Sequence, residues 1–145
     1  MKIKMDLTGF KAALDAEVQK FHDAARPAAQ AGAQVIYSLA RIKVPVSEKG
    51  HWFHGTSFKK TGQKYWFAPG SLRNSIYQVY SKDNSNEAKA TYHVSWNRTK
   101  APYAWMVEFG TSRAPAHPFM RPAILEGRKE AAQAVKDEFL KRVKV

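Results

Sequence analysis

The feature that most constrains the fold of this chain is a long row of apolar residues in its first third. The members of the row are Phe10, Leu14, Val18, Phe21, Ala25, Ala28, Ala31, Val35 and Leu39. They recur at spacings of three and four, close to the 3.6 residues of an α-helical turn. Because the row stays in phase across Pro27, it predicts one helix kinked at that proline, or two helices stacked nearly end to end.

The predicted helix is long for a chain of this size. A straight helix from about residue 9 to residue 41 would measure roughly 50 Å, whereas a compact domain of this length is roughly 40 Å across. The helix therefore either bends at Pro27, which we favour, or overhangs the domain and offers apolar surface to another subunit. Small residues gather between 24 and 33, with Gly32 among them, and they permit the backbone of a partner element to come close.

The middle of the chain changes from helical to β-like patterns. A Val-Pro-Val sequence ends the first helix, because the residue before a proline avoids helical backbone. Residues 71–80 and 90–97 are β-like and flank a turn at 83–86, so we expect an antiparallel hairpin. Residues 103–109 can make two helical turns, and Gly110 is expected to cap them in a left-handed conformation.

A second long helix is predicted near the C-terminus. Pro122 is expected as its first residue, since proline is tolerated in the first helical turn. Its expected inner face consists of Leu125, Ala132, Val135, Phe139 and Val143. We therefore predict a single domain, residues 1–145, of the α+β class, with a long N-terminal helix kinked near Pro27, an antiparallel β-sheet and a C-terminal helix.

Composition narrows the classes of function. The formal net charge of +12 is spread over the whole chain and predicts attraction to polyanions or acidic surfaces, or simply a solvated, lysine-rich surface. The absence of cysteine excludes disulfides, thiol nucleophiles and thiolate metal sites. The longest uncharged apolar run, 101–107, is too short to span a membrane, and no apolar segment follows Lys2 and Lys4, so we expect neither a membrane span nor a secretory signal.

Residues 47–69 show no clear period and are predicted to form a long aromatic–basic loop. Its candidate interface residues are Trp52, Phe53, Phe58, Lys59, Lys60, Lys64, Tyr65 and Trp66. Aromatic anchors with a basic rim suit a protein interface, which we favour. The same composition can stack on the bases of single-stranded nucleic acid, and it also fits a loop that folds its rings back onto its own domain.

Catalytic patterns are missing from the sequence. It has no glycine-rich phosphate loop and no pair of acids suited to two-carboxylate catalysis. His51 and His54 have the spacing of two metal ligands, but no third ligand lies nearby, so we interpret them as exposed loop imidazoles. We therefore expect no enzyme, no catalytic residues, no cofactor and no metal site.

Glu108 is the one acidic residue in a strongly apolar context, between Val107 and Phe109. A buried carboxylate needs a cationic or hydrogen-bonding partner. The candidate partners are Arg73, Arg113 and Arg121. We expect a structural ion pair that fixes the turn rather than a catalytic acid.

Four short motifs occur in a fixed order along the chain. They are Val44-Pro45-Val46, Gly70-Ser71-Leu72-Arg73-Asn74-Ser75-Ile76, Tyr103-Ala104-Trp105-Met106-Val107-Glu108-Phe109-Gly110-Thr111, and Ala116-His117-Pro118-Phe119-Met120-Arg121-Pro122-Ala123. Together they resemble the tailed-bacteriophage gene-product-ten-like family of neck and tail-completion proteins, over roughly residues 30–135. Two departures are a Pro-Gly pair at 69–70 where that family usually has Thr-Gly, and the length of the 47–69 segment.

The resemblance implies a non-enzymatic structural protein of a phage or prophage, located in the virion neck or tail and in the bacterial cytoplasm during assembly. It implies self-association in a ring, most simply of six subunits, with contacts to other neck and tail proteins and non-specific contact with DNA in a channel. The matched residues are interpreted as scaffold: Leu72, Arg73, Ile76, Tyr103, Glu108, Phe109, Gly110, Thr111, Pro118, Phe119, Arg121 and Pro122. From the residues alone, the alternative is a nucleic-acid-binding module that uses the 47–69 segment; a small hydrolase or nuclease ranks third.

Overall fold

The computed structural model describes residues 7–55 and 57–144, so Lys2 and Lys4 lie outside the described residues. The elements are α1 (Thr8–Lys43), β1 (His51–Phe53), α2 (Phe58–Thr61), β2 (Tyr65–Phe67), α3 (Ser71–Ser75), β3 (Ile76–Tyr80), β4 (Tyr92–Trp96), α4 (Ala104–Phe109) and α5 (Met120–Val143). The predicted α+β class is confirmed, with a long N-terminal helix and a C-terminal helix. The strands form two separate two-stranded antiparallel sheets, β1–β2 and β3–β4.

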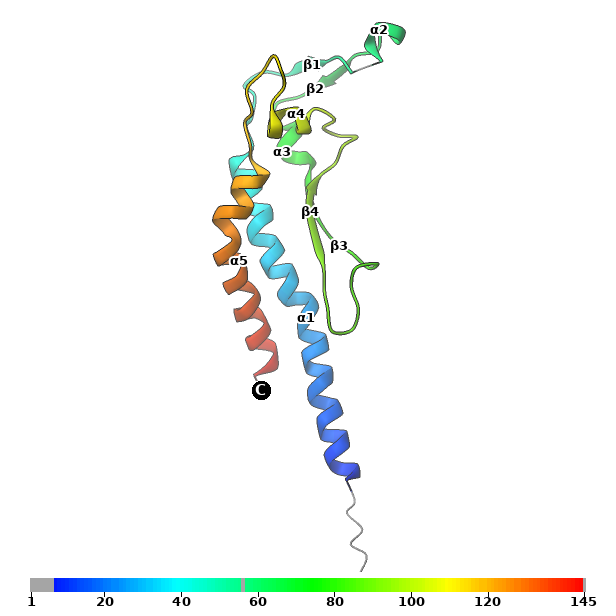
Figure 1. Cartoon of the computed structure of the whole chain (residues 1–145), viewed down its shortest axis with the longest axis vertical. Helices are drawn as coiled ribbons and strands as arrows, with labels where there is room; N and C mark the ends of the chain where they lie inside the picture. The colour runs from blue at the N-terminus through cyan, green and yellow to red at the C-terminus, as the bar shows by residue number, and fades with distance from the viewer. Residues whose placement is uncertain (1–6, 56, 145) are drawn as a thin grey trace, which may run out of the picture.

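Helix α1 is a single helix of 36 residues that passes Pro27 without a break (Figure 1). Its length is roughly 54 Å at 1.5 Å per residue. The first turns of α1 extend beyond the C-terminal end of α5 and beyond the β3–β4 hairpin (Figure 1). Helix α1 therefore overhangs the domain, and the favoured prediction of a bend at Pro27 is wrong.

The other half of α1 packs antiparallel against α5 through small residues. A Cβ atom added to Gly32 would lie 3.2 Å from the backbone oxygen of Ala131, and one added to Gly127 would lie 2.5 Å from Leu39 Cδ1. The absence of both Cβ atoms lets the two helices approach closely. The close approach expected at Gly32 is thus confirmed, and its partner element is α5.

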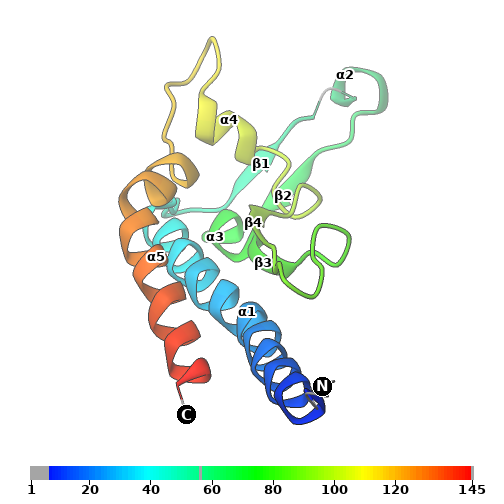
Figure 2. The same cartoon turned by 60° about the horizontal axis from the view of Figure 1, so that its bottom comes forward.

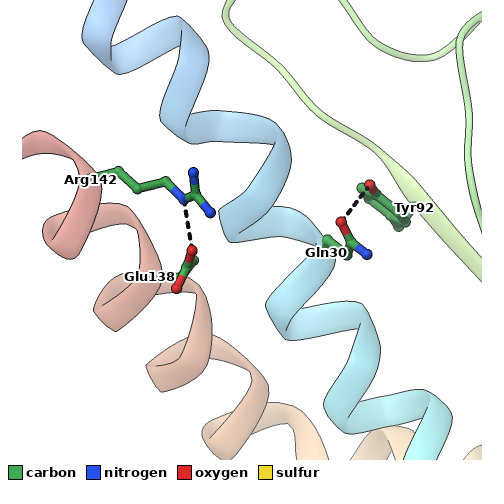
Figure 3. Close-up of polar contacts among 4 residues, drawn as sticks. All are labelled: Gln30, Tyr92, Glu138 and Arg142. Carbon is green, nitrogen blue, oxygen red and sulfur yellow. Dashed lines mark hydrogen bonds and ion pairs between the residues drawn. The ribbon is translucent and has the colours of Figure 1, made fainter.

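The predicted antiparallel hairpin is β3–β4, which pairs from Ile76 opposite Trp96 to Tyr80 opposite Tyr92. It lies on the side of α1 away from α5 (Figure 2). The Tyr92 hydroxyl donates a hydrogen bond to Gln30 Oε1 of α1 at 3.4 Å; Figure 3 draws it beside the Arg142–Glu138 ion pair of α5, 2.7 Å long. Helix α1 is therefore the central layer of the molecule.

Residues 71–75 form helix α3 and not the start of a strand, which corrects the sequence-based prediction. Gly70 adopts a left-handed conformation with φ +78°. The backbone amide of Asn74 donates a hydrogen bond to the carbonyl oxygen of Gly70 at 2.9 Å. The Ser71 hydroxyl donates to the Ala68 carbonyl oxygen at 2.7 Å and supports the same turn. These local hydrogen bonds turn the backbone before β3 begins.

Helix α5 begins at Met120, so Pro122 is its third residue and not its first. Leu125 and Ala132, which were predicted to face inward, are exposed. The inner face is made instead by small residues such as Gly127, because α1 lies too close for large side chains. Val135, Phe139 and Val143 are half-buried, in agreement with the prediction.

The core lies where the last turns of α1 meet α3, α4 and the start of α5. Its buried members are Ala40, Val44, Leu72, Ile76, Ala101, Tyr103, Ala104, Phe119, Met120 and Ala123. Phe119 is fully buried, and its ring centroid lies 5.8 Å from that of Trp96. Among the described residues, no helix is long and apolar enough to cross a membrane.

Candidate interaction surfaces

The 47–69 segment contains a β-hairpin, which we call the hairpin arm (residues 51–55 and 57–67), and not a loop without secondary structure. Aromatic residues pair across its two strands, and such cross-strand pairs stabilise a sheet. The paired residues are far apart in the sequence, so local patterns did not predict this hairpin. Phe53 and Phe67 pack on Tyr103, with ring centroids 5.9 and 4.9 Å away. One face of the arm thus does fold back onto the domain.

The opposite face of the hairpin arm is exposed. The Trp52 and Trp66 rings meet edge to face at 5.2 Å, and both side chains are more than half exposed. Lys64 Nζ lies 5.5 Å from the centre of the Trp52 ring, a cation–π contact. Tyr65 is also exposed, but it pairs with Phe53 on the other face, so the outer face combines two tryptophan side chains with a cation.

The tip of the arm carries the other predicted residues. Lys59 and Lys60 are exposed on α2, and Phe58 is half-buried because its ring stacks on His54 at 4.3 Å. His54 is exposed, as expected, whereas His51 is half-buried against Tyr103, with ring centroids 5.0 Å apart. No group of three or more possible metal ligands occurs in the described part of the chain.

A second exposed surface is the outer half of α1. We call it the α1 ridge; it consists of Leu7, Phe10, Leu14, Val18 and Phe21. These side chains are 43% to 68% exposed and lie at helical spacing on one face. Phe21 makes a ring contact of 5.8 Å with Phe139 near the end of α5. The rest of the ridge extends past the end of α5.

A third surface is an apolar groove of about 330 Å³ between α4, β4 and the start of α5, which we call the α5 groove. It is lined by Trp96, Trp105, Glu108, Phe109, Met120, Arg121, Ile124 and Leu125. The Trp105 and Phe109 rings lie 4.0 Å apart, and the Arg121 guanidinium lies 5.5 Å from the Phe109 ring centre. Sequence reasoning missed this groove, although the longest uncharged apolar run of the chain, 101–107, ends in α4.

The α5 groove continues into a shallower apolar depression along α5, because Ile124 lines both. This depression is lined by small residues of α1 and α5, including Gly32, Ala33 and Ala131. Val94 of β4 also lines it. A strip of apolar surface thus runs from α4 along α5.

Glu108 fixes the wall of the α5 groove. Its carboxylate is buried, and it accepts hydrogen bonds from the backbone amides of Phe119, Met120 and Arg121 at 2.8, 2.9 and 3.0 Å. The prediction that Glu108 pairs with an arginine is therefore wrong. The backbone amides at the start of α5 have no hydrogen-bond partner within the helix, and the Glu108 side chain on α4 caps them. The cap ties α4 to α5.

The connection between α4 and α5 also depends on Gly110 and Thr111. Gly110 has φ +75° and ψ −179°, a region that in practice only glycine occupies, so its positive φ is confirmed but its ψ is extended and not that of a left-handed cap. A Cβ there would lie 2.8 Å from the Ala116 amide nitrogen. The Thr111 hydroxyl accepts hydrogen bonds from the Arg113 and Ala114 amides at 3.2 and 3.1 Å.

The other motif residues divide between core and surface. Leu72, Ile76, Tyr103 and Phe119 are core residues, Pro122 is half-buried, and Arg73, Phe109, Pro118 and Arg121 are exposed. Burial raises the pKa of Tyr103 above its usual value of 10.0. The motifs thus build the core end of the molecule and one wall of the α5 groove.

No protein-family model, curated protein or solved structure matches this chain. The three surfaces are therefore interpreted from their own chemistry. Soluble proteins rarely leave large contiguous apolar patches exposed unless they bind a protein, a membrane or a ligand there. On this chain, exposed aromatic rings and aliphatic side chains occur on a strongly basic protein.

Proposed function

We propose that this chain is a structural morphogenesis protein of a tailed phage or prophage, acting without catalysis at the head–tail junction as a neck or tail-completion component. The observation that carries the proposal is the exposed α1 ridge. Its large apolar side chains lie outside the domain's own core, so their burial requires a neighbouring molecule. The protein acts by self-association and by contacts with other neck and tail proteins.

The four ordered sequence motifs support the phage assignment. Two of them meet at the α4–α5 connection, where Glu108, Gly110 and Thr111 make the contacts described above. These motif residues determine the shape of a surface and do not form a reactive centre. We therefore place the protein in the virion neck or tail, and in the bacterial cytoplasm while particles assemble.

The positive charge supports a position around DNA. A net charge of +12 on 145 residues favours contact with phosphates without any reading of bases. In a ring, most simply of six subunits, such contacts would face the channel. The α1 ridge and the α5 groove are different patches of one chain, and contacts between different patches generate rings when the rotation closes.

The native mass of the purified chain tests this proposal. Light scattering after size exclusion, at low and moderate salt, is expected to give one closed species of several subunits, and negative-stain images are expected to show rings with a central channel. An open filament or a symmetric dimer would contradict the proposal. A chain that remains monomeric at its highest soluble concentration would remove self-association from it.

A second candidate function is nucleic-acid binding, favoured by one specific observation: Trp52 and Trp66 are exposed beside Lys64 on the outer face of the hairpin arm. Such rings stack on single-stranded bases while lysines meet phosphates. A fluorescent oligonucleotide distinguishes the two functions. A binding module retains it tightly, with affinity that falls steeply between about 50 and 200 mM salt and is lost in Trp52→Ala; an assembly protein shows at most weak, sequence-independent retention.

A further inference from the structure

We propose that the α1 ridge of one copy docks into the α5 groove of a second copy, head to tail. This rests on the proposed self-association and deepens it, because it names both sides of the contact. The ridge is a helix face with large apolar side chains, whereas the groove is a concave apolar surface between a helix and a strand. A helix laid into an apolar groove is a common mode of recognition.

The shapes of the two surfaces suit each other. The outer turns of α1, from Thr8 to about Asp23, form a helical segment roughly 24 Å long. Exposed Trp105 and Leu125 line the α5 groove, and small residues such as Ala33 line the depression that continues it along α5. Small lining residues such as Ala33 let another helix come close, as Gly32 does between α1 and α5 within the chain.

The charges of the two surfaces are also complementary. Of the three acids on the outer turns of α1, Asp15 and Glu17 flank the ridge, whereas Asp23 lies on the opposite face of the helix. Lys11 also flanks the ridge, and Lys20 pairs with Glu17 at 2.8 Å. The groove wall carries Arg121, and Arg128 lies one helical turn from Ile124 on the same face of α5. Docking would thus bring Asp15, beside the ridge, toward the arginines at the groove, where such pairing helps to fix register and partner choice.

A second copy is the occupant that these observations favour. Helix α1 is continuous, so the ridge cannot fold back into the groove of its own chain. Each copy carries one ridge and one groove, and a single repeated contact covers both kinds of surface. Because the two patches differ, each new copy leaves one ridge and one groove free until the ring closes.

The test uses one variant for each surface and a mixture of the two. Leu14→Glu places a charge on the ridge, and Ile124→Glu places one in the groove; both side chains are about half exposed in the single chain. Ala16→Glu, on the opposite face of the same helix turn and also exposed, is the matched control. Circular dichroism and thermal melting of each variant establish that the fold is retained.

We expect Leu14→Glu and Ile124→Glu each to raise the dissociation constant of self-association at least about 30-fold, as for an interface hot spot, while Ala16→Glu assembles like the natural chain. The mixture of the two defective variants is expected to form one-to-one complexes that grow no further, since the first keeps its groove and the second keeps its ridge. This result identifies a contact between two different patches.

Three results would overturn the docking. If the natural chain forms a ring and Leu14→Glu forms the same ring, the ridge is not the interface, although the proposed function stands. If the two defective variants do not form a complex when mixed, the groove is not the partner of the ridge. A natural chain that stays monomeric at its highest soluble concentration overturns the docking together with the self-association on which it rests.

Discussion

The two halves of α1 share one apolar period, but the apolar face is buried in the inner half and exposed in the outer half. In the inner half, the buried residues are small: Ala24, Ala28, Gly32 and Ala40. In the outer half, the ridge residues are large and exposed. Large apolar side chains are usually the ones buried, so the outer half reverses the ordinary preference.

The difference shows that a hydrophobic period specifies a face and not the molecule that covers it. The inner half buries its face against α5 of the same chain, and it needs small residues because the two backbones lie close together. The outer half contacts α5 at Phe21, which meets Phe139, and its first turns extend past the end of α5 (Figure 1). Its large side chains are what a second molecule would need to gain enough apolar contact.

The largest expected effect breaks this comparison directly. Ala28 is 2% exposed and Leu14 is 52% exposed. Ala28→Glu buries an unpaired charge between α1 and α5 and should lower the free energy of unfolding by more than about 3 kcal/mol. Leu14→Glu should change it by no more than about 0.5 kcal/mol. Urea unfolding of the monomer, followed by circular dichroism, measures both; equal losses would show that the outer half is part of the folded core.

A smaller effect is expected where α5 begins. Glu108→Gln keeps the size of the side chain but turns an NH₂ group toward backbone amides that need an acceptor. We expect a loss of about 2–3 kcal/mol in unfolding free energy. The control is Glu126→Gln, which removes only an exposed ion pair with Lys43, worth at most about 1 kcal/mol. An unchanged melting temperature for Glu108→Gln would refute the capping role.

The same substitution at two glycines sharpens the contrast between packed and overhanging regions. Gly110→Ala forces a Cβ against the Ala116 amide at a positive φ, and it should cost about 1–2 kcal/mol. Gly9, in the first turn of α1, has no atom within 4 Å of the position of an added Cβ. Gly9→Ala should therefore leave the urea midpoint unchanged, and a comparable loss at both positions would argue against a free outer helix.

The smallest effect is a pH dependence of the core end. Burial raises the pKa of Tyr103 in the folded chain, so the unfolded chain releases this proton at a lower pH. Folding stability should therefore fall as the pH rises above about 10. Tyr103→Phe should make that fall shallower between about pH 9 and pH 11, whereas Tyr77→Phe, at an exposed position, should not. Identical slopes for Tyr103→Phe and the natural chain would contradict this.

The sequence predicts what depends on local spacing. The apolar period predicted both long helices, the alternation around Val94 predicted a strand, and the small residues near Gly32 predicted a close contact. It failed where distant partners decide. The period of Leu125 indicated an inner face, but the closeness of α1 excludes large side chains there. The burial of Glu108 was predicted correctly, but the sequence could not show that its hydrogen-bond partners are backbone amides and not an arginine.

The candidate surfaces follow the same rule. The exposed rings of the hairpin arm were predicted from composition, but the division into an outer face with Trp52 and an inner face with Phe53 required the pairing of β1 with β2. The α5 groove could not be predicted, since Trp105, Ile124 and Trp96 come from three elements. Composition can thus indicate which residues are suited to an interface, while only the fold shows which of them share a surface.

The most direct test of the central claim, that the outer half of α1 joins one copy to the next, is the native mass of two chains at equal concentration. Light scattering after size exclusion should give a closed species of several subunits, most simply six, for the natural chain and a monomer for Leu14→Glu. Equal masses for the two chains, whether both are rings or both are monomers, would contradict the claim.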